Sequence, residues 1–521
     1  MREVLRNVSL LKKLLVILVT AVMLMSIMSC GANTTTKTTD SGTTATGEPV
    51  TISILVDYSA AEPPTKDNQV TKEFEKKTNT KLDIMWTNNN DYLNKLNVTL
   101  AGGAIPDLTK VKSSNTSGVD NPLAIQLIRN GGVWDLGPYI KDYPNLAAYP
   151  KEAMDITKVD GKQYYLPSVR PIAGSYFIVI RQDWLDKLSL KSPTTMDEFY
   201  DCLLAFTTGD PDGDGQANTF GFNGELSLDS RLDTYIFTCI FNGTNGQWKE
   251  VDGKIVHVDT LPETRESLLW MKKLYDNKII PKDFSVMKQT QYQDLLNAGT
   301  AGAGRGDTAD AWIYTAEARK INPKIEYVYV PYLSGPKGPF AIATNGSFGA
   351  FIVPKSSNET KLKKALELMD YGASEEGSFM ALYGLKGIHY NLVDGLPIAT
   401  PQQATDSVSQ GTFGKIFERW NPYLWTFWPG MDKAYMERNV TFVDEATKHL
   451  VFNPVAGLIS DTAVKFGLEF EKKSDELRTK IILGVEPITA WDTYVAQLAS
   501  DANLKKMTDE YSAGYAAAHA N

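Results

Sequence analysis

The sequence is poor in the residues and motifs on which most catalytic mechanisms depend. Its 521 residues include four histidines and three cysteines, and no pair of histidines forms the HExxH motif of a zinc protease. A GxSxG nucleophile elbow and a phosphate-binding P-loop are also absent, and the glycine-rich stretch 302–307 fails the GxGxxG spacing. The sequence therefore gives no positive indication of catalysis. Its 62 acidic residues leave the paired carboxylates of a glycosidase as an alternative.

Long apolar runs are also scarce, and the longest lies near the N-terminus. Two lysines precede an apolar run over residues 14–28, which is shorter than the roughly 20 residues of a membrane span. A positive segment, a short apolar core and a small residue before the cut are typical of a secretory signal peptide. Residues 27–30, IMSC, predict a bacterial lipoprotein signal in which Cys30 is acylated, for example by palmitate, and becomes the new N-terminus. An uncleaved membrane helix is the alternative.

Long runs of one charge sign are missing, and the formal net charge is −9. The negative charge argues against nucleic acid and an anionic membrane surface as partners, because both require clustered Lys and Arg. Residues 31–48 are rich in Thr, Gly and Ser and lack large apolar side chains, so we expect a flexible tether there. Beyond Cys30, Cys202 and Cys239 are the remaining thiols of an exported chain. The sequence favours Cys202 as a buried core residue and leaves a disulfide open.

Strands and helices alternate from residue 50 onward, which implies an α/β fold with a parallel sheet. Thr195 and Glu198 have the spacing of a helix capping box. The region beyond about residue 400 is predicted to be mostly helical. The clearest predicted elements are strands at 50–59, 80–86 and 348–355 and helices at 70–79, 263–280 and 358–377.

One loop has the spacing of a metal site. Three aspartates at alternate positions precede Gly215, and short carboxylates in such a loop point into one concavity. Calcium takes six to eight oxygen ligands of this kind, but the twelfth position of an EF-hand would be Gly221, so the motif is incomplete. The pattern predicts a structural calcium site, with a solvated acidic turn as the alternative. The expected ligands are Asp210, Asp212, Asp214, the carbonyl of Gln216, and Asn218.

Several motifs resemble the family 1 extracellular solute-binding proteins, the lipoprotein receptors of carbohydrate ABC importers. The most specific is IVIRQDWLDKLSLKSPTTMDEFYDCLLAFTTGDPDGDGQANTFGF at 178–222. Others are GGAIPDL at 102–108, EEGSFMALYGLKGIHY at 375–390 and ITAWDTYVAQL at 488–498. The likeness covers residues 50–515. Larger members of the family bind calcium in the Asp-Pro-Asp-Gly loop, although Thr219 stands here where the family often has an acidic residue.

The resemblance implies a periplasmic-binding-protein-like type II fold. Two α/β lobes are then joined by crossing hinge strands, with a helical C-terminal region, and close on a ligand between them. The expected divisions are a signal peptide at 1–29, a tether at 30–48, lobe 1 at 49–165 and 346–400, and lobe 2 at 166–345 and 401–521.

Candidate ligand-binding residues are aromatic, or lie near predicted strand ends, where α/β sheets place ligands. Aromatic faces stack on sugar rings, and polar side chains bind the hydroxyls. Trp420, Trp425 and Trp428 crowd a loop that cannot easily bury them all, although a core plug under the hinge is the alternative. The other candidates, for which packing or a turn is the alternative, are Tyr58, Asp107, Trp312, Asn345 and Tyr390.

The sequence and the resemblance together predict a receptor without catalytic activity. It is expected to be a monomer, lipid-anchored on the extracytoplasmic face of the cell membrane, that captures an oligosaccharide and delivers it to an ABC permease. The alternatives are a receptor of the same fold for a peptide, and a surface glycosidase or polysaccharide-binding protein outside any transporter.

Overall fold

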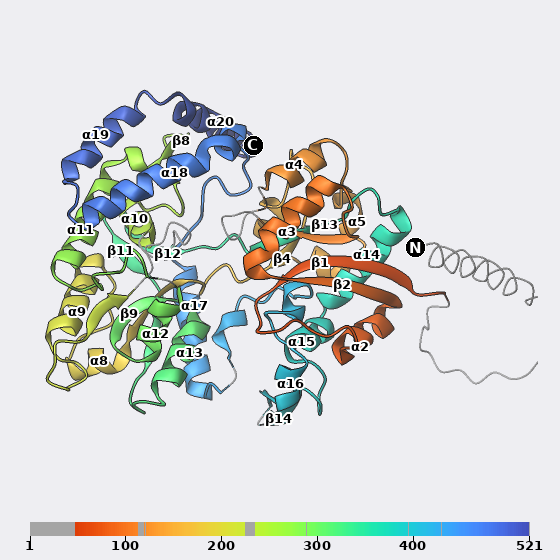
Figure 1. Ribbon diagram of the computed structural model, residues 1–521, viewed down its shortest axis with the longest axis horizontal. Coiled ribbons are helices and arrows are strands. Elements are labelled where there is room, and N and C mark those ends of the chain that lie inside the picture. The colour runs from red at the N-terminus through yellow and green to blue at the C-terminus, as the bar shows by residue number, and fades with distance from the viewer. Residues whose placement is uncertain are drawn as a thin grey trace, which may run out of the picture. The chain divides into compact units, whose positions relative to one another are not determined.

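The computed structural model describes residues 47–519, apart from 113–118, 120, 224–234, 288, 394 and 429. Cys30, the predicted signal peptide and nearly all of the predicted tether lie outside the described residues. Two larger sheets, each covered by its own helices, organise the described part (Figure 1). None of the described helices combines the length and the apolar character that a membrane crossing requires.

The first sheet has the strand order β2-β1-β3-β13-β4. Its first three strands are parallel, as predicted, whereas β13 runs antiparallel to both of its neighbours. The carboxyl ends of β1, β3 and β4 therefore share one edge with the amino end of β13. The bounds are β1 Val50–Tyr58, β2 Thr80–Asn88, β3 Leu108–Val111, β4 Leu166–Val169 and β13 Ser347–Ile352.

Helices cover both faces of the first sheet. On one face Phe74 of α2 stacks on Phe417, with ring centroids 4.0 Å apart. On the other face Tyr92 and Leu96 of α3 pack with Leu55 of β1. The helices are α2 Gln69–Thr78, α3 Asn89–Gly102, α4 Pro122–Arg129, α5 Gly137–Ile140, α6 Pro144–Ala147, α7 Lys151–Asp155, α14 Glu359–Gly372 and α15 Glu375–Tyr383.

The single helix predicted over 358–377 is wrong, because two helices occupy this stretch. α14 ends at Gly372, and Ser374 caps the start of α15 by accepting a hydrogen bond from the Gly377 amide. A serine at this position satisfies an amide at the start of a new helix, so the chain changes direction there. The sequence pattern alone did not distinguish a cap from an interior serine.

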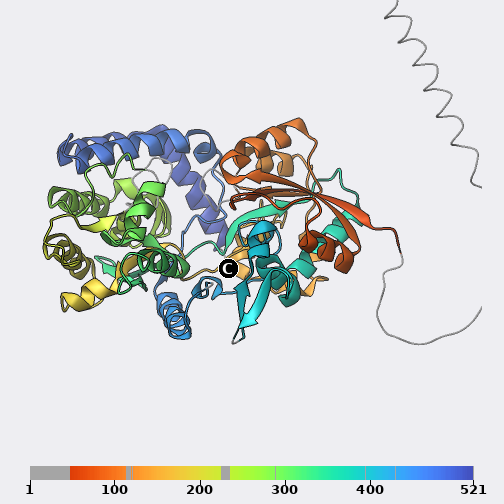
Figure 2. The ribbon, with the colours of Figure 1, turned by 60° about the horizontal axis from the view of Figure 1, so that its bottom comes forward.

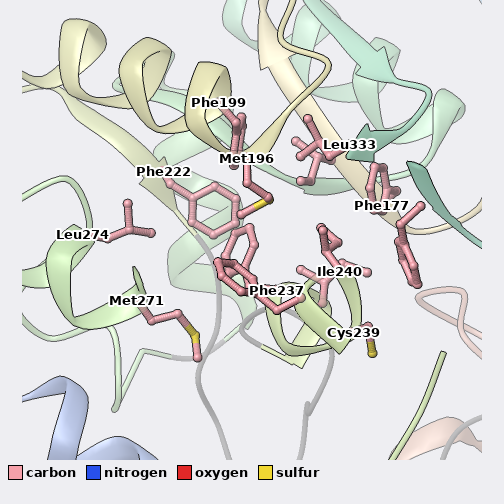
Figure 3. Packing of buried hydrophobic residues seen from close by; sticks show 14 of the residues in the cluster. Phe177, Met196, Phe199, Phe222, Phe237, Cys239, Ile240, Met271, Leu274 and Leu333 are labelled. Carbon is pink, nitrogen blue, oxygen red and sulfur yellow. The ribbon is translucent and has the colours of Figure 1, made fainter. Parts of the chain in front are cut away.

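The second sheet has the order β10-β5-β9-β6 and packs on a large aromatic core. Figure 3 shows Phe199, Phe222 and Phe237 meeting in this core. The capping box of Thr195 and Glu198 is confirmed. The elements are β5 Phe177–Arg181, β6 Phe220–Asn223, β9 Ala301–Gly306, β10 Tyr327–Val330, α8 Gln182–Lys187, α9 Met196–Thr208, α10 Tyr235–Asn242, α11 Pro262–Asp276, α12 Gln289–Asn297 and α13 Thr308–Ala318.

Both remaining cysteines are buried in this second core. Cys202 and Cys239 are free thiols, which confirms the prediction of a core role for Cys202. Burial raises the pKa of the Cys202 thiol to about 11, so this group stays protonated and unreactive at neutral pH.

Shorter strands and the C-terminal helices complete the described part. Helices α18 and α20 pack against each other, and they also contact α11 and β8 respectively (Figures 1 and 2). The remaining bounds are β7 Trp248–Val251, β8 Lys254–His257, β11 Leu333–Gly335, β12 Gly338–Ile342, β14 Tyr390–Val393, β15 Leu396–Ala399, β16 Leu450–Val451, η1 Val258–Thr260, η2 Phe413–Lys415, η3 Leu424–Thr426, α16 Pro401–Thr405, α17 Lys433–Thr447, α18 Asp461–Ile482, α19 Ile488–Leu498 and α20 Ala502–Ala518.

Two neighbouring segments carry the chain between the first sheet and the part that contains the second sheet and the three-stranded sheet β11-β12-β16. Residues 170–176 lead from β4 to β5, and residues 343–346 lead from β12 to β13. The amide of Arg170 donates to the carbonyl of Gly346, and the amide of Thr344 donates to that of Ile172, both at 2.9 Å. These crossing segments match the expected crossing strands.

β4 and residues 408–417 pack with the first sheet, although the sequence predicted them in the second lobe.

A buried ion pair links α18 to the second core. The guanidinium of Arg478 pairs with the carboxylate of Asp259, and Ser474 Oγ donates to the same carboxylate at 2.6 Å. Arg478 also donates to Thr238 Oγ1 at 3.0 Å. Asp259 is 1% exposed and Arg478 6% exposed, so neither charge has water to replace its partner.

We predict that Arg478→Met destabilises the protein by about 3 to 5 kcal/mol, because it leaves the Asp259 carboxylate buried without its counter-charge. Urea unfolding followed by circular dichroism measures the loss. Arg265→Met is the matched control, since the Arg265–Asp492 pair is 38% and 48% exposed and should contribute about 1 kcal/mol or less. Equal losses in the two variants would contradict the structural role of the buried pair.

Candidate ligand-binding site

Buried charges gather at the carboxyl edge of the first sheet. Asp57, near the end of β1, lies between the side chains of Lys110 on β3 and Lys112 directly after it. The ammonium of Lys112 is 3.1 Å from Asp57 Oδ2, and that of Lys110 is 3.5 Å from Asp57 Oδ1. Lys112 also donates to Asn89 Oδ1 at 2.7 Å. Lys110 and Asp57 have no exposed side-chain surface, so water does not screen their charges.

A third lysine reaches the same carboxylate from a different part of the chain. Lys415 ends η2, and its ammonium is 3.5 Å from Asp57 Oδ2. Its main-chain carbonyl accepts a hydrogen bond from Lys110 Nζ at 3.1 Å. Arg170, directly after β4, pairs with Glu418 three residues beyond Lys415. The chain around residue 415 therefore docks on this edge through charged groups.

Two residues at the start of β13 adjoin the lysines. The ring of Phe348 contacts their ammonium groups, and Gly349 leaves space for their side chains. The three ammonium groups lie 5.8, 4.8 and 4.9 Å from the ring centroid of Phe348, for Lys110, Lys112 and Lys415 respectively. Gly349 has φ +78°, and a Cβ there would lie 2.9 Å from the side chain of Lys112 and 2.8 Å from a main-chain oxygen. The β13–β4 register shifts at the same place. A glycine bulge thus leaves space for two lysine stems beside the strand.

Burial and mutual attraction shift the pKa values of these groups. Burial raises the pKa of the Asp57 carboxyl, but the three lysines outweigh this effect and hold it well below its usual range. Burial lowers the pKa of Lys415 to about 8 and that of Arg170 to about 10, against the opposing effect of Asp57. The pKa of Lys110 is also lowered by burial. The site therefore holds an ionised carboxylate among cationic side chains whose charged forms are disfavoured by burial.

The second sheet carries polar and aromatic groups at the edge next to the crossing segments. Tyr176 precedes β5 and is 47% exposed, and the guanidinium carbon of Arg305 lies 4.3 Å from its ring centroid. Asp307 follows β9 and caps α13 by accepting from the amides of Ala309 and Asp310 at 2.8 Å. Burial and the neighbouring Asp310 raise the pKa of the Asp307 carboxyl well above its usual value. An exposed aromatic ring and hydrogen-bonding groups thus lie at this edge as well.

Two of the predicted ligand-binding residues lie close to these edges. Tyr58 is half-buried and follows Asp57 at the end of β1, as expected from the sequence. Asn345 is half-buried in the second crossing segment. Their roles in binding stay predictions.

Asp107 lies elsewhere, because it precedes β3 instead of following it. The predicted place at a strand carboxyl end is therefore wrong. Its carboxylate accepts hydrogen bonds from Ser53 Oγ at 2.8 Å, from Ser357 Oγ at 2.6 Å and from Lys361 Nζ at 3.0 Å. Asp107 ties β1, β3 and α14 together at the opposite edge of the sheet.

Trp312 and Tyr390 are packing residues in this structure. Trp312 is 8% exposed on α13, and its ring meets that of Tyr435 edge-on with centroids 5.0 Å apart. Tyr390, at the start of β14, meets Phe379 edge-on at 5.4 Å. Their roles in ligand binding stay predictions.

The loop that contains Trp420, Trp425 and Trp428 has both buried and exposed aromatic surface, so each of the two alternatives applies to a part of it. Trp420 is half-buried against the core of the first sheet, and Trp425 is also half-buried. The carbonyl of Trp425 accepts from Thr308 Oγ1 at 2.8 Å, which fixes the loop to the start of α13. Trp428 is 36% exposed. Part of the loop is therefore packed against the core of the first sheet, and part of its aromatic surface faces solvent.

The aspartate loop 210–218 has donors that suit a hard cation. Ligand oxygens of Asp210, Asp212 and Asp214 all lie within 4.8 Å of one another, and all three residues are exposed. Burial and the two neighbouring carboxylates raise the pKa of Asp212. Asn218 Nδ2 donates to Asp214 Oδ2 at 2.7 Å, and the Gln216 amide donates to Asp214 Oδ1 at 2.8 Å. The carboxylate set thus fits calcium chemically, and its mutual repulsion is what a cation would relieve.

The charged cluster was not predicted from the sequence. Its signal was present as two lysines at alternate positions in the strand LTKVK and as an aspartate near the end of the apolar strand VTISILVDY. Charged residues on one face of a buried strand are unusual without partners. Lys415 and Arg170 carry no comparable signal, because only the fold brings them to the same edge.

Comparison with known proteins agrees with this architecture. The family model for bacterial extracellular solute-binding proteins matches residues 58–378. The polygalacturonan/rhamnogalacturonan-binding protein YtcQ of Bacillus subtilis (strain 168) is 32% identical over 503 residues, which cover 95% of this chain and 97% of that protein. Lipoprotein LipO of the same organism is 28% identical over 451 residues, covering 85% and 88% of the two chains.

A solved structure shows the same fold. The Streptococcus pneumoniae ABC-transporter substrate binding protein FusA, as an EF-hand mutant in complex with fructo-nystose, has a TM-score of 0.66 and 19% sequence identity. The match covers 90% of this chain and 100% of that one. The chain therefore belongs to the bacterial extracellular solute-binding protein family, and its fold is the expected type II periplasmic-binding fold. This family, YtcQ and FusA are named for binding.

Proposed function

We propose that this protein is the substrate-binding component of an ABC importer and takes an oligosaccharide between the two sheet edges that adjoin the crossing segments. The observation that carries the proposal is that Arg170 of the charged cluster begins the first crossing segment and the exposed Tyr176 ends it. The 32% identical relative is named for binding polygalacturonan and rhamnogalacturonan, which supports a polysaccharide fragment as ligand. No catalytic step is proposed.

The groups at these edges suit a sugar. An exposed tyrosine ring offers a flat apolar face to a pyranose ring, and the adjacent Arg305 and Asp307 can bind hydroxyl groups. Crossing segments joined by main-chain hydrogen bonds form a suitable hinge for lobes that close on a ligand. An ABC permease is the partner that such a receptor serves, and we expect the receptor to be a monomer.

The ligand class is tested by thermal shift and isothermal titration calorimetry with oligosaccharides and with short peptides. We expect an oligosaccharide at 100 times its Kd to stabilise the protein by about 2.7 kcal/mol, because it binds only the folded state. Tyr176→Ala should weaken that binding by about tenfold through loss of the stacking face, whereas Tyr176→Phe keeps the ring and most of the affinity. Binding of peptides and of no oligosaccharide would overturn the proposal in favour of a peptide receptor.

Lipid anchoring through Cys30 is part of the proposal. The sequence IMSC supports it, and so does the 28% identical relative, which is named a lipoprotein. We expect the full-length protein, produced in a bacterium that acylates lipoproteins, to partition into the detergent phase of Triton X-114. Cys30→Ala should partition into the aqueous phase, and Cys202→Ala, which alters a buried thiol, should behave like the unchanged protein. Aqueous partitioning of the unchanged protein would contradict the anchor.

We also propose that the loop 210–218 binds calcium in a structural role. The fit of its three carboxylates supports this, as does the naming of an EF-hand in the FusA structure. Calcium added to EDTA-treated protein should raise its melting temperature but leave that of Asp212→Asn unchanged, because this change removes one ligand charge.

Asp252→Asn, in an exposed turn between β7 and β8, is the control and should respond like the unchanged protein. Elemental analysis establishes that the EDTA-treated sample is metal-free. Absence of any calcium-dependent shift in that sample would show that the loop is a solvated acidic turn.

A further inference from the structure

We propose that Lys112, Lys415 and Arg170 bind a carboxylate of the ligand, so that the substrate class is an acidic, uronate-containing oligosaccharide. The proposal rests on the proposed oligosaccharide-binding function and deepens it. It assigns a chemical task to the charged cluster at the carboxyl edge of the first sheet, which consists of Asp57, Lys110, Lys112, Arg170, Lys415 and Glu418.

The first argument is the charge balance of the cluster. Four cationic side chains face two carboxylates, which leaves a formal excess of two positive charges in a buried place. A buried charge is costly unless a counter-charge compensates it. A purely structural cluster of this size would be expected to balance its charges. The excess is what a bound anion would neutralise.

The second argument is the hydrogen-bonding capacity that remains. An ammonium group has three donors. Within the described part of the chain, the Lys415 ammonium approaches one acceptor, Asp57 Oδ2, and the Lys112 ammonium donates to Asp57 and Asn89. Each therefore keeps donor capacity for an incoming oxygen. The Lys110 ammonium instead lies on the inner side, where it binds the Lys415 carbonyl.

The third argument is accessibility, which differs within the cluster. The side chain of Lys110 has no exposed surface, whereas those of Lys112, Arg170 and Lys415 are 8%, 10% and 11% exposed. The two lysines with spare donors, Lys112 and Lys415, thus have some exposed side-chain surface, whereas Lys110 has none. They lie where β3 and β4 end, and ligands of α/β sheets bind beyond the carboxyl ends of strands. Arg170 also begins the first crossing segment, so a bound anion would contact the hinge.

The cluster also explains how an acidic protein could take an acidic ligand. The whole chain has a formal net charge of −9, which repels anions at long range. A local excess of buried cations offsets this repulsion only where the ligand is seated. Burial lowers the pKa of Lys415 to about 8, and a bound carboxylate would favour the charged form of this lysine at neutral pH. The 32% identical relative is named for binding polygalacturonan and rhamnogalacturonan, and these polymers contain acidic galacturonate.

The test compares an acidic trisaccharide with its methyl ester, in which a neutral and slightly larger group replaces each carboxylate. Isothermal titration calorimetry at pH 7 measures the binding of trigalacturonate and of its fully methyl-esterified form, with a neutral galactotriose as a third ligand. We expect trigalacturonate to bind at least about tenfold more tightly than its methyl ester, as expected for loss of one charge-assisted hydrogen bond.

Lys415→Met keeps the apolar stem and removes the charge. We expect it to weaken trigalacturonate binding by about 10- to 100-fold and to leave the affinity for the methyl ester nearly unchanged. A structural role alone would weaken both ligands equally. Lys415→Arg should retain most of the preference for the acid. Lys364→Met is the matched control, because Lys364 is 14% exposed and pairs with Glu367 on α14, away from the cluster.

The outcomes separate this inference from the proposed function. Equal binding of acid and ester, tighter binding of neutral sugars, or an equal effect of Lys415→Met on both ligands would overturn the inference and leave an oligosaccharide receptor. Failure of every carbohydrate to bind, with peptides bound instead, would overturn the proposed function as well.

Discussion

The attraction between the Asp57 carboxylate and three lysine ammonium groups fixes the edge of the first sheet on which the proposed site depends. Lys110 and Lys112 approach it from β3, and Lys415 approaches it from a segment about 300 residues further along the chain. Because the contacts are buried, water screens them little, and they join that segment to the sheet beside its apolar contacts. The same contacts leave a positive excess beside the first crossing segment. One arrangement thus serves both the fold and the proposed recognition of an anion.

The two sheets bring different chemistry to the same crossing. The first contributes cations and a glycine bulge at Gly349, which leaves space for the lysine stems. The second contributes Tyr176 and Arg305, an exposed ring with a guanidinium stacked on it. An acidic sugar has an apolar ring face and a carboxylate, so both kinds of group would be used at once. A receptor built in this way would distinguish ligands by charge at one edge and by shape at the other.

Much of the fold follows from local sequence patterns, whereas little of the site does. Alternating β-branched residues and capping signals located β1, β2, α2 and the capping box of Thr195 correctly, because these elements depend on neighbouring residues. The break at Ser374 was missed because a cap and an interior serine look alike in sequence. Asp107 was assigned to the wrong strand end, and the contact of Trp312 with Tyr435 was not predicted. Lys415 meets Asp57, and Arg170 meets Glu418, only through the crossing of the chain, which no local pattern encodes.

The most direct test of this account is a crystal structure of the protein with trigalacturonate. The account predicts a ligand carboxylate within about 3 Å of the Lys112 or Lys415 ammonium, as expected for a charge-assisted hydrogen bond. The Tyr176 ring should lie against a sugar ring in the same structure. A trigalacturonate seated away from the cluster, with the contacts of Asp57 unchanged and no anion near Lys415, would contradict it.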